Sequence, residues 1–182
     1  MRCRLMLLVM MFSMAFAARN AQANNIAVTN ILLQSGDKTN YTYVQLDVSW
    51  NSAWRASWLE TSVTPNITVT NWDAAWLFLK YRTAGGNWSH ASLSTTNSHH
   101  VCPTSAVINV GLSTNAGGTN FGVGAFLYRS NEGSGSWTSR IKLRWNYAQD
   151  GLLSTDRVDV GVHAVEMAYV PQGSFFAGDG TS

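Results

Sequence analysis

The sequence predicts an all-β protein, a two-sheet antiparallel β-sandwich of the immunoglobulin-like or jelly-roll-like kind. Short runs rich in valine, isoleucine, threonine and aromatic residues recur between polar breaks that contain glycine. Two of these runs, 41–50 and 138–147, alternate apolar and polar residues, as strands with one buried face do. No amphipathic helical period follows residue 23. About eight strands at this spacing are typical of a sandwich.

The first part of the mature chain supplies strands that we expect at 25–33, 41–50 and 66–70. Trp54 and Trp58 lie between the last two of these strands, in a polar stretch that we expect to be a connection. Polar residues with glycine or asparagine separate the first two strands, as turn chemistry requires.

The segment 71–82 is the most apolar one in the mature chain. Its middle part, 74–79, is apolar on both faces, which favours a central strand that is covered on both sides. A helix is the alternative, because alanine and leucine favour helices and Asn71 is a suitable cap. We prefer the strand, because a glycine turn follows it and an alternating run at 87–94 can return as its partner.

The second half of the chain repeats the pattern of short strands and polar breaks. In the last strand the apolar positions change phase near Ala164 and Val165, which a β-bulge would explain. Three tryptophans occupy inward-facing strand positions and are expected in the core: Trp50, Trp76 and Trp145. The remaining strands are expected at 105–113, 121–129, 138–147 and 157–169.

Residues 1–23 have the features of a secretory signal peptide, with cleavage expected before Asn24. Arginines precede the apolar run 5–18, and Ala21-Gln-Ala23 provides a small-residue cleavage site. The apolar run is shorter than the roughly 20 residues that a membrane-spanning helix needs. We therefore expect a mature chain without a membrane span that is secreted, periplasmic or located at the cell surface.

Removal of the leader changes what the composition implies. The leader holds three arginines and no acidic residue, so its loss changes the formal net charge from +2 to −1. The basic pI therefore gives no reason to expect a nucleic-acid partner. Cys102 is then the only cysteine, so no internal disulfide is expected and stability must come from burial.

The end of the chain reads as a strand from Val165, a turn at Pro171-Gln-Gly173 and the start of a second arm at Ser174-Phe-Phe-Ala177. The run Met167-Ala-Tyr-Val-Pro-Gln-Gly-Ser-Phe-Phe-Ala-Gly-Asp179 resembles the opening hairpin of the formylglycine-generating-enzyme (sulfatase-modifying-factor) domain. That hairpin reads roughly Met-Val-x-Ile-Pro-Gly-Gly-x-Phe-x-Met-Gly, so Gln172 replaces a usual glycine.

With the leader and the strand pattern, the resemblance divides the chain into three expected parts: a signal peptide at 1–23, a sandwich domain at 24–164 and the start of a truncated formylglycine-generating-enzyme-like domain at 165–182. The segments 72–82 and 143–147 are also similar to a lead domain that precedes the catalytic-type domain in some exported bacterial proteins. Members of the family modify a sulfatase cysteine with cysteines far downstream of this hairpin. Those residues are absent here, so we expect a non-enzymatic chain without a cofactor.

His99-His100-x-Cys102 is the only cluster with metal-ligand side chains. A metal site would need a third or fourth ligand, which only His90 and His163 offer as nitrogen donors. A solvated loop is the favoured interpretation, and Cys102 is expected to be a bystander thiol or to pair between chains.

Two surface patterns suggest ligands. Arg140, Lys142 and Arg144 form a basic stripe, which we interpret as a solvated outer face, with attraction of an acidic glycan or an acidic neighbouring domain as the alternative. Trp54, Trp58 and Trp88 are candidate ligand-binding residues, because exposed tryptophans on a secreted sandwich can stack on sugar rings.

Three functions remain open at this stage. The first is an exported, non-catalytic module that leads into a formylglycine-generating-enzyme-like domain and serves in binding or positioning, with that domain as its partner. The second is a binding module for extracellular glycans. The third is a self-assembling surface or filament subunit, in which the strand near Phe175 and Phe176 completes a neighbour's sheet.

Overall fold

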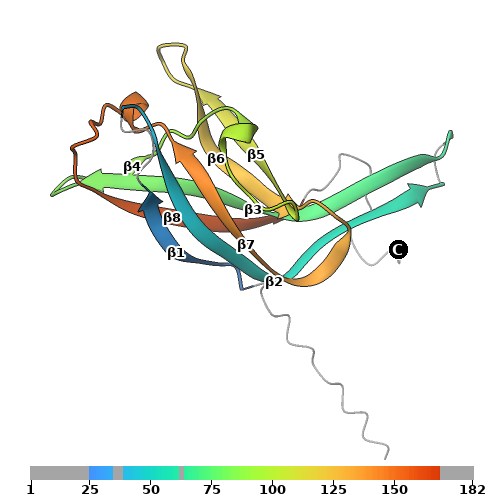
Figure 1. Ribbon diagram of the computed structural model, residues 1–182. Coiled ribbons are helices and arrows are strands. Elements are labelled where there is room, and N and C mark those ends of the chain that lie inside the picture. Colours follow the sequence, from blue (N-terminus) through green and yellow to red (C-terminus); the bar gives the residue numbers. More distant parts are fainter. Residues whose placement is uncertain (1–24, 35–38, 62–63, 169–182) are drawn as a thin grey trace, which may run out of the picture.

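The computed structural model describes residues 25–34, 39–61 and 64–168, and it confirms an all-β, antiparallel, sandwich-like fold (Figure 1). The expected signal peptide and the terminal segment with Phe175 and Phe176 lie outside these residues. In the part described, no helix has the length and apolarity that crossing a membrane requires. The strands are β1 (Ala27–Gln34), β2 (Thr42–Glu60), β3 (Ile67–Thr83), β4 (Ser89–His90), β5 (Ala106–Thr114), β6 (Asn120–Arg129), β7 (Gly133–Trp145) and β8 (Val158–Ala168).

The strands form two layers that belong to one continuous hydrogen-bonded sheet. In the first layer, β2 pairs with β1 along one edge and with β7 along the other. In the second layer, β3 lies between β8 and β6, and β5 extends the layer beyond β6. The layers join where Arg55 to Glu60 of β2 pairs with Ile67 to Trp72 of β3, and Figure 1 shows this ribbon projecting from the body.

The core lies between the two layers and is built from alternate residues of the strands. Trp50 and Trp145 are each 1% exposed, as expected for core residues. Trp76 was expected there too, but it is only half-buried, because the alternation of β3 places it on the outer side with Phe78. Residues that contribute to the core include Val44, Leu46 and Val48 of β2, Ile141 and Leu143 of β7, Ala75, Leu77 and Leu79 of β3, and Ala125 and Leu127 of β6.

The segment after β4 closes the sandwich between β6 and β7. The strand expected at 87–94 is short, because regular pairing with β3 is limited to Ser89 and His90. Leu93 follows, fully buried, and its backbone bridges both Gly122 of β6 and Trp145 of β7. The apolar residues of this run therefore fill the open side of the core instead of forming a long strand.

Asp73 holds the junction between the layers. Its carboxylate is 1% exposed and accepts hydrogen bonds from Trp50 Nε1 at 2.8 Å and from the backbone nitrogen of Trp54 at 2.7 Å. These contacts lie at the register shift between Trp50 and Ala53, where β2 turns from the first layer toward the second. Burial raises the pKa of this carboxyl, and the two donated hydrogen bonds oppose that effect.

Two further strand predictions are wrong, and both errors again concern length. The polar stretch with Trp54 and Trp58 is not a connection, because β2 continues through it to Glu60 and pairs with β3. The strand expected to end near residue 70 is likewise continuous with the next one, since β3 runs from Ile67 to Thr83 without interruption. In both places the sequence is polar, and pairing between residues 55–60 of β2 and 67–72 of β3 stabilises the strands instead of burial in the core.

The bulge expected in β8 is absent, since its register with β3 is unbroken from Asp73 opposite Ala168 to Thr83 opposite Val158. The phase change has another cause. Val158, Val160 and Val162 pack against the core, whereas the apolar positions that follow lie on the outer side, with Val165 50% and Met167 45% exposed. A domain boundary at 165 would fall inside this strand, which continues to Ala168.

Replacement of Asp73 by asparagine tests the junction. An amide has one acceptor oxygen, so one of the two buried N–H groups would lose its partner, and we expect a loss of about 2 kcal/mol in the free energy of unfolding. Urea denaturation measures the change. The control is Asp159→Asn, which breaks an exposed ion pair with Arg82 and should cost less than about 1 kcal/mol. Equal losses in both variants would contradict the role of Asp73.

Candidate functional site

The outer face of the first layer is polar. On this face Arg140 donates to both carboxylate oxygens of Asp47, at 2.7 and 2.9 Å, and Asn30 donates to Oδ2 at 2.7 Å. Arg144 hydrogen-bonds Asn146 and lies 3.7 Å from the ring centre of Tyr41. Arg140 and Arg144, two of the three cations in the predicted basic stripe, therefore interact with side chains of the same face. This agrees with the interpretation of the stripe as a solvated outer face.

The outer face of the second layer has the opposite character. The even-numbered residues of β3 point away from the core here, and in β8 the odd-numbered residues do so. Most are half-buried or exposed, although no strand of the described chain covers them. We call this surface the aromatic face and define it by Trp72, Ala74, Trp76 and Phe78 of β3, Phe126 and Tyr128 of β6, and His163, Val165 and Met167 of β8.

The rings of the aromatic face are arranged in groups along β3. Trp72 stacks on Tyr128 with ring centres 5.1 Å apart and planes 23° apart. Trp76 meets Phe126 at 4.6 Å. Further along, Phe78 lies nearly parallel to the imidazole of His163 at 5.1 Å and also stacks with that of His90 at 6.2 Å. The result is a row of aromatic groups that follows the strand.

Two glycines hold the indole of Trp76 against the sheet. A β-carbon at Gly111 would lie 2.5 Å from Cη2 of Trp76, and one at Gly124 would lie 2.5 Å from Cζ2. Since real β-carbons do not approach so closely, only glycine at both positions lets the indole lie over β5 and β6. The half-buried Trp76 thus forms a platform in the middle of the row.

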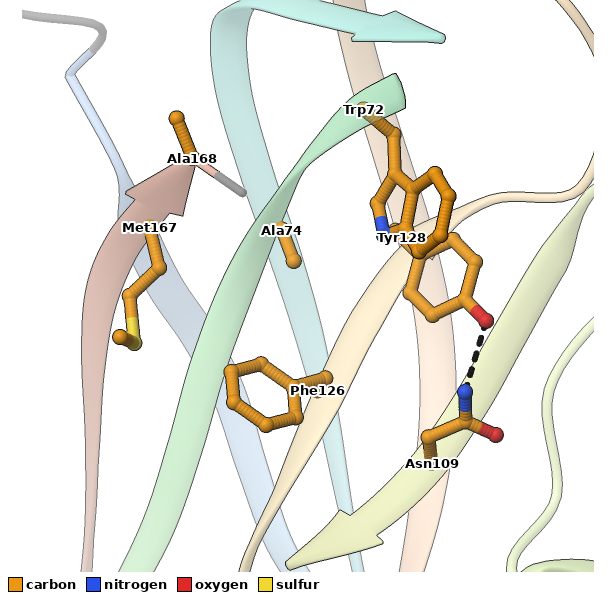
Figure 2. A pocket seen from close by; sticks show the side chains of 7 residues that line it. All are labelled: Trp72, Ala74, Asn109, Phe126, Tyr128, Met167 and Ala168. Carbon is orange, nitrogen blue, oxygen red and sulfur yellow. Dashed lines mark hydrogen bonds between the residues drawn. The ribbon is translucent and has the colours of Figure 1, made fainter. Parts of the chain in front are cut away.

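A pocket of about 270 Å³ opens next to this platform (Figure 2). The small side chain of Ala74 lies between Met167 on one side and the aromatic rings on the other. Asn109 Nδ2 donates to the hydroxyl of Tyr128 at 2.7 Å, which places one polar pair in a mostly apolar wall. This volume is just below the range of about 300–1,000 Å³ usual for small-molecule sites. The pocket is lined by Trp72, Ala74, Asn109, Phe126, Tyr128, Met167 and Ala168.

The cluster His99, His100 and Cys102 does not converge on a common point. His100 is 6% exposed, and both ring nitrogens are used: Nδ1 accepts from the backbone of Arg144, and Nε2 contacts Ser94 O. Burial lowers the pKa of His100 and raises that of the Cys102 thiol, whose sulfur donates to a backbone oxygen. Among the residues described, no group of three or more histidine, cysteine, aspartate or glutamate side chains is placed to hold a metal ion.

The structure separates the three tryptophans that the sequence suggested as ligand-binding residues. Trp54 and Trp58 lie on the projecting ribbon, on the side opposite to Arg55 and Trp72. Trp88 is 48% exposed and lies over Gly161. The guanidinium carbon of Arg82 lies over its indole, 4.8 Å from the ring centre. Only Trp88 therefore extends the aromatic face.

Sequence reasoning missed the main residues of the site, which are Trp72, Trp76, Phe126 and Tyr128. The available signal was the segment 74–79, which is apolar on both faces and which we expected to be covered on both sides. Comparison with protein-family models, with curated proteins and with solved structures finds no match for this chain.

Substitutions of the two glycines test the placement of Trp76. Gly111→Ala contacts only the movable end of the indole, so we expect a shift in tryptophan fluorescence with a small loss of stability. Gly124→Ala also meets the backbone oxygen of Leu77 at 2.7 Å and should cost about 2 kcal/mol. Gly117→Ala, which meets nothing closer than 3.4 Å, is the control. Unchanged fluorescence and stability in Gly124→Ala would show that the indole lies elsewhere.

The polar face makes a prediction about pH. Hydrogen bonds from Arg140 and Asn30 lower the pKa of Asp47 from 3.8 to about 2. A carboxylate with a lowered pKa stabilises the folded state fully above its unfolded pKa, and this contribution is lost as the pH falls toward about 2. We expect urea unfolding between pH 5 and about 2 to show a shallower pH dependence in Asp47→Asn than in the wild type. Identical slopes would rule out this ion pair as a contributor.

Proposed function

We propose that the protein is an exported, non-catalytic module that binds a glycan on the aromatic face. The observation that carries the proposal is the difference between the two outer faces of the sandwich. One face carries mostly polar side chains, several of them paired with each other, beside the Tyr41–Tyr43 ring pair, whereas the other displays a row of aromatic rings along β3. Contiguous apolar surface on a soluble protein commonly marks a binding site.

Glycans match the chemistry of this row. The C–H faces of a pyranose ring pack against the faces of aromatic side chains, and tyrosine and tryptophan add polar groups at their edges. Here the Tyr128 hydroxyl, the Asn109 amide and the exposed His163 imidazole lie in or beside the row and can hydrogen-bond sugar hydroxyls. A row along a strand suits an extended chain of sugars better than a single unit.

Holding a glycan is favoured over cleaving one. Glycoside hydrolysis generally uses two carboxyl groups on either side of the scissile bond. None of the residues that define the aromatic face carries a carboxylate. The neighbouring Asp159 is engaged by Arg82 Nε at 2.9 Å.

Alanine substitution tests the proposal. On a glycan array followed by calorimetry with the best ligand, we expect Trp76→Ala to weaken binding at least tenfold, which corresponds to about 1.4 kcal/mol. Trp58→Ala is the matched control, because Trp58 is 44% exposed but lies on the other side of the ribbon, and it should leave the affinity within twofold. Loss of binding in Trp58→Ala alone, or no binding to any glycan, would reject the proposal.

A second candidate function is that of a lead module for a formylglycine-generating-enzyme-like domain. It is favoured by the position of the last residues of β8, because Met167 and Ala168 line the pocket and are also the first two residues of the run that resembles the family's hairpin. The two functions are compatible, since a lead module can bring a bound glycan to the domain that follows it.

The gene sequence beyond codon 182 tests this second candidate. A reading frame that continues into the remainder of the formylglycine-generating-type fold would support it. A stop codon with no such sequence downstream would contradict it and would leave glycan binding unaffected.

A further inference from the structure

Cationic side chains lie beside both ends of the aromatic face. At one end, the guanidinium carbon of Arg55 is 4.9 Å from the ring centre of Trp72 and 5.8 Å from that of Tyr128. Beyond Phe78 at the other end, Lys80 occupies the next outward position of β3, opposite Gly161 of β8. The row of rings is thus bounded by an arginine and a lysine.

Like Arg129, Lys142, Arg144 and Arg157, these two cations have no carboxylate partner among residues 25–34, 39–61 and 64–168, and they are the two that lie next to the row of rings. The ion pairs found there join Arg82 to Asp159 and Arg140 to Asp47. Both Arg55 and Lys80 are half-buried, so their charges lie close to any ligand on the row. An unpaired, partly desolvated cation beside a binding surface attracts an anionic group more strongly than one in bulk water does.

The orientation of Arg55 also favours a carboxylate. A guanidinium that lies over an aromatic ring keeps its in-plane N–H donors at its edge, and these donors match the two oxygens of a carboxylate. The contact with Trp72 restricts the Arg55 guanidinium without using its N–H donors. Stacking reduces the number of side-chain conformations that the arginine loses when a ligand binds.

We propose that the glycan on the aromatic face is acidic and that Arg55 and Lys80 bind carboxylates of its uronic acid units. The inference rests on the proposed function and adds the chemical class of the ligand. Arg55 pairs with Trp72 in the sheet, and Trp72 and Lys80 are about 27 Å apart along β3 at the usual rise per residue. A single sugar does not span that distance, so the ligand that uses both cations is an oligomer.

An acidic glycan is thus expected on the aromatic face of the second layer and not on the polar outer face of the first layer. The sequence suggested it for the stripe of Arg140, Lys142 and Arg144, where Asp47 neutralises the first and Asn146 hydrogen-bonds the third. Lys142 remains on that polar face, paired with β2 at Gln45. It supplies a matched control, because its loss removes the same charge from the opposite side.

Oligogalacturonate and its methyl ester test the inference, because they share a backbone and differ in charge. At low salt we expect the acid to bind at least tenfold more tightly than the ester. Arg55→Gln and Lys80→Gln should each weaken binding of the acid several-fold and flatten its salt dependence, while binding of the ester stays within twofold. Lys142→Gln should leave both affinities within twofold.

A neutral β-glucan separates the failure of this inference from the failure of the proposed function. The acidic ligand is overturned if acid and ester bind with equal affinity, or if Lys142→Gln weakens binding of the acid as much as Arg55→Gln and Lys80→Gln do. In either case the proposed glycan binding still stands if the glucan binds and Trp76→Ala abolishes its binding. Preference for a sulfated glycan over the uronate also overturns it. Absence of binding to the acid overturns the inference, and absence of binding to any glycan on the array rejects both proposals. Circular dichroism confirms that each variant is folded.

Discussion

The fold depends on one buried carboxylate. Asp73 lies where β2 leaves the first layer, and it receives hydrogen bonds from an indole and from a backbone N–H of that strand. An uncompensated charge at this depth would be costly, so both donors are needed for the site to be stable. Because Asp73 points inward, its neighbours Trp72 and Ala74 must point outward. The junction and the aromatic face therefore follow from the same alternation in β3.

The two outer faces of the scaffold differ in how far their side chains satisfy one another. On the polar face, Asp47, Arg140 and Asn30 satisfy one another, which leaves little for a ligand to gain. On the aromatic face, apolar area stays in water, and each half-buried ring forgoes part of the free energy that full burial would give. Val165 and Met167 add to this cost. A ligand that covered the row would recover this free energy by removing the apolar surface from water.

Strands with one buried face could be predicted from the sequence, because the pattern of Val44, Leu46 and Val48 has a single interpretation. The segment 74–79 could not be resolved in the same way. Apolar residues on both faces of a strand indicate either a second covering layer or a displayed surface, and local periodicity does not distinguish them. The change of phase at Val165 is the same ambiguity, which we interpreted as a bulge.

The site itself was less accessible to sequence reasoning. Trp54 and Trp58 stood out because they lay outside the recognised strands, yet pairing with β3 places them on the far side of the ribbon. The sequence placed His100 beside Cys102 as a candidate ligand, yet its ring nitrogens contact the backbone of Ser94 and of Arg144, which is 44 residues away in the sequence. Such partners depend on tertiary contacts that no local spacing encodes.

The end of β8 has a consequence for anything that the chain carries after it. Ala168 lies at the rim of the pocket, opposite Asp73 at the root of the ribbon. If the row binds a polymer as proposed, that polymer would lie close to the point where the chain leaves β8. At such distances the effective concentration of one tethered group around another is in the millimolar range, so even weak binding would keep the polymer present.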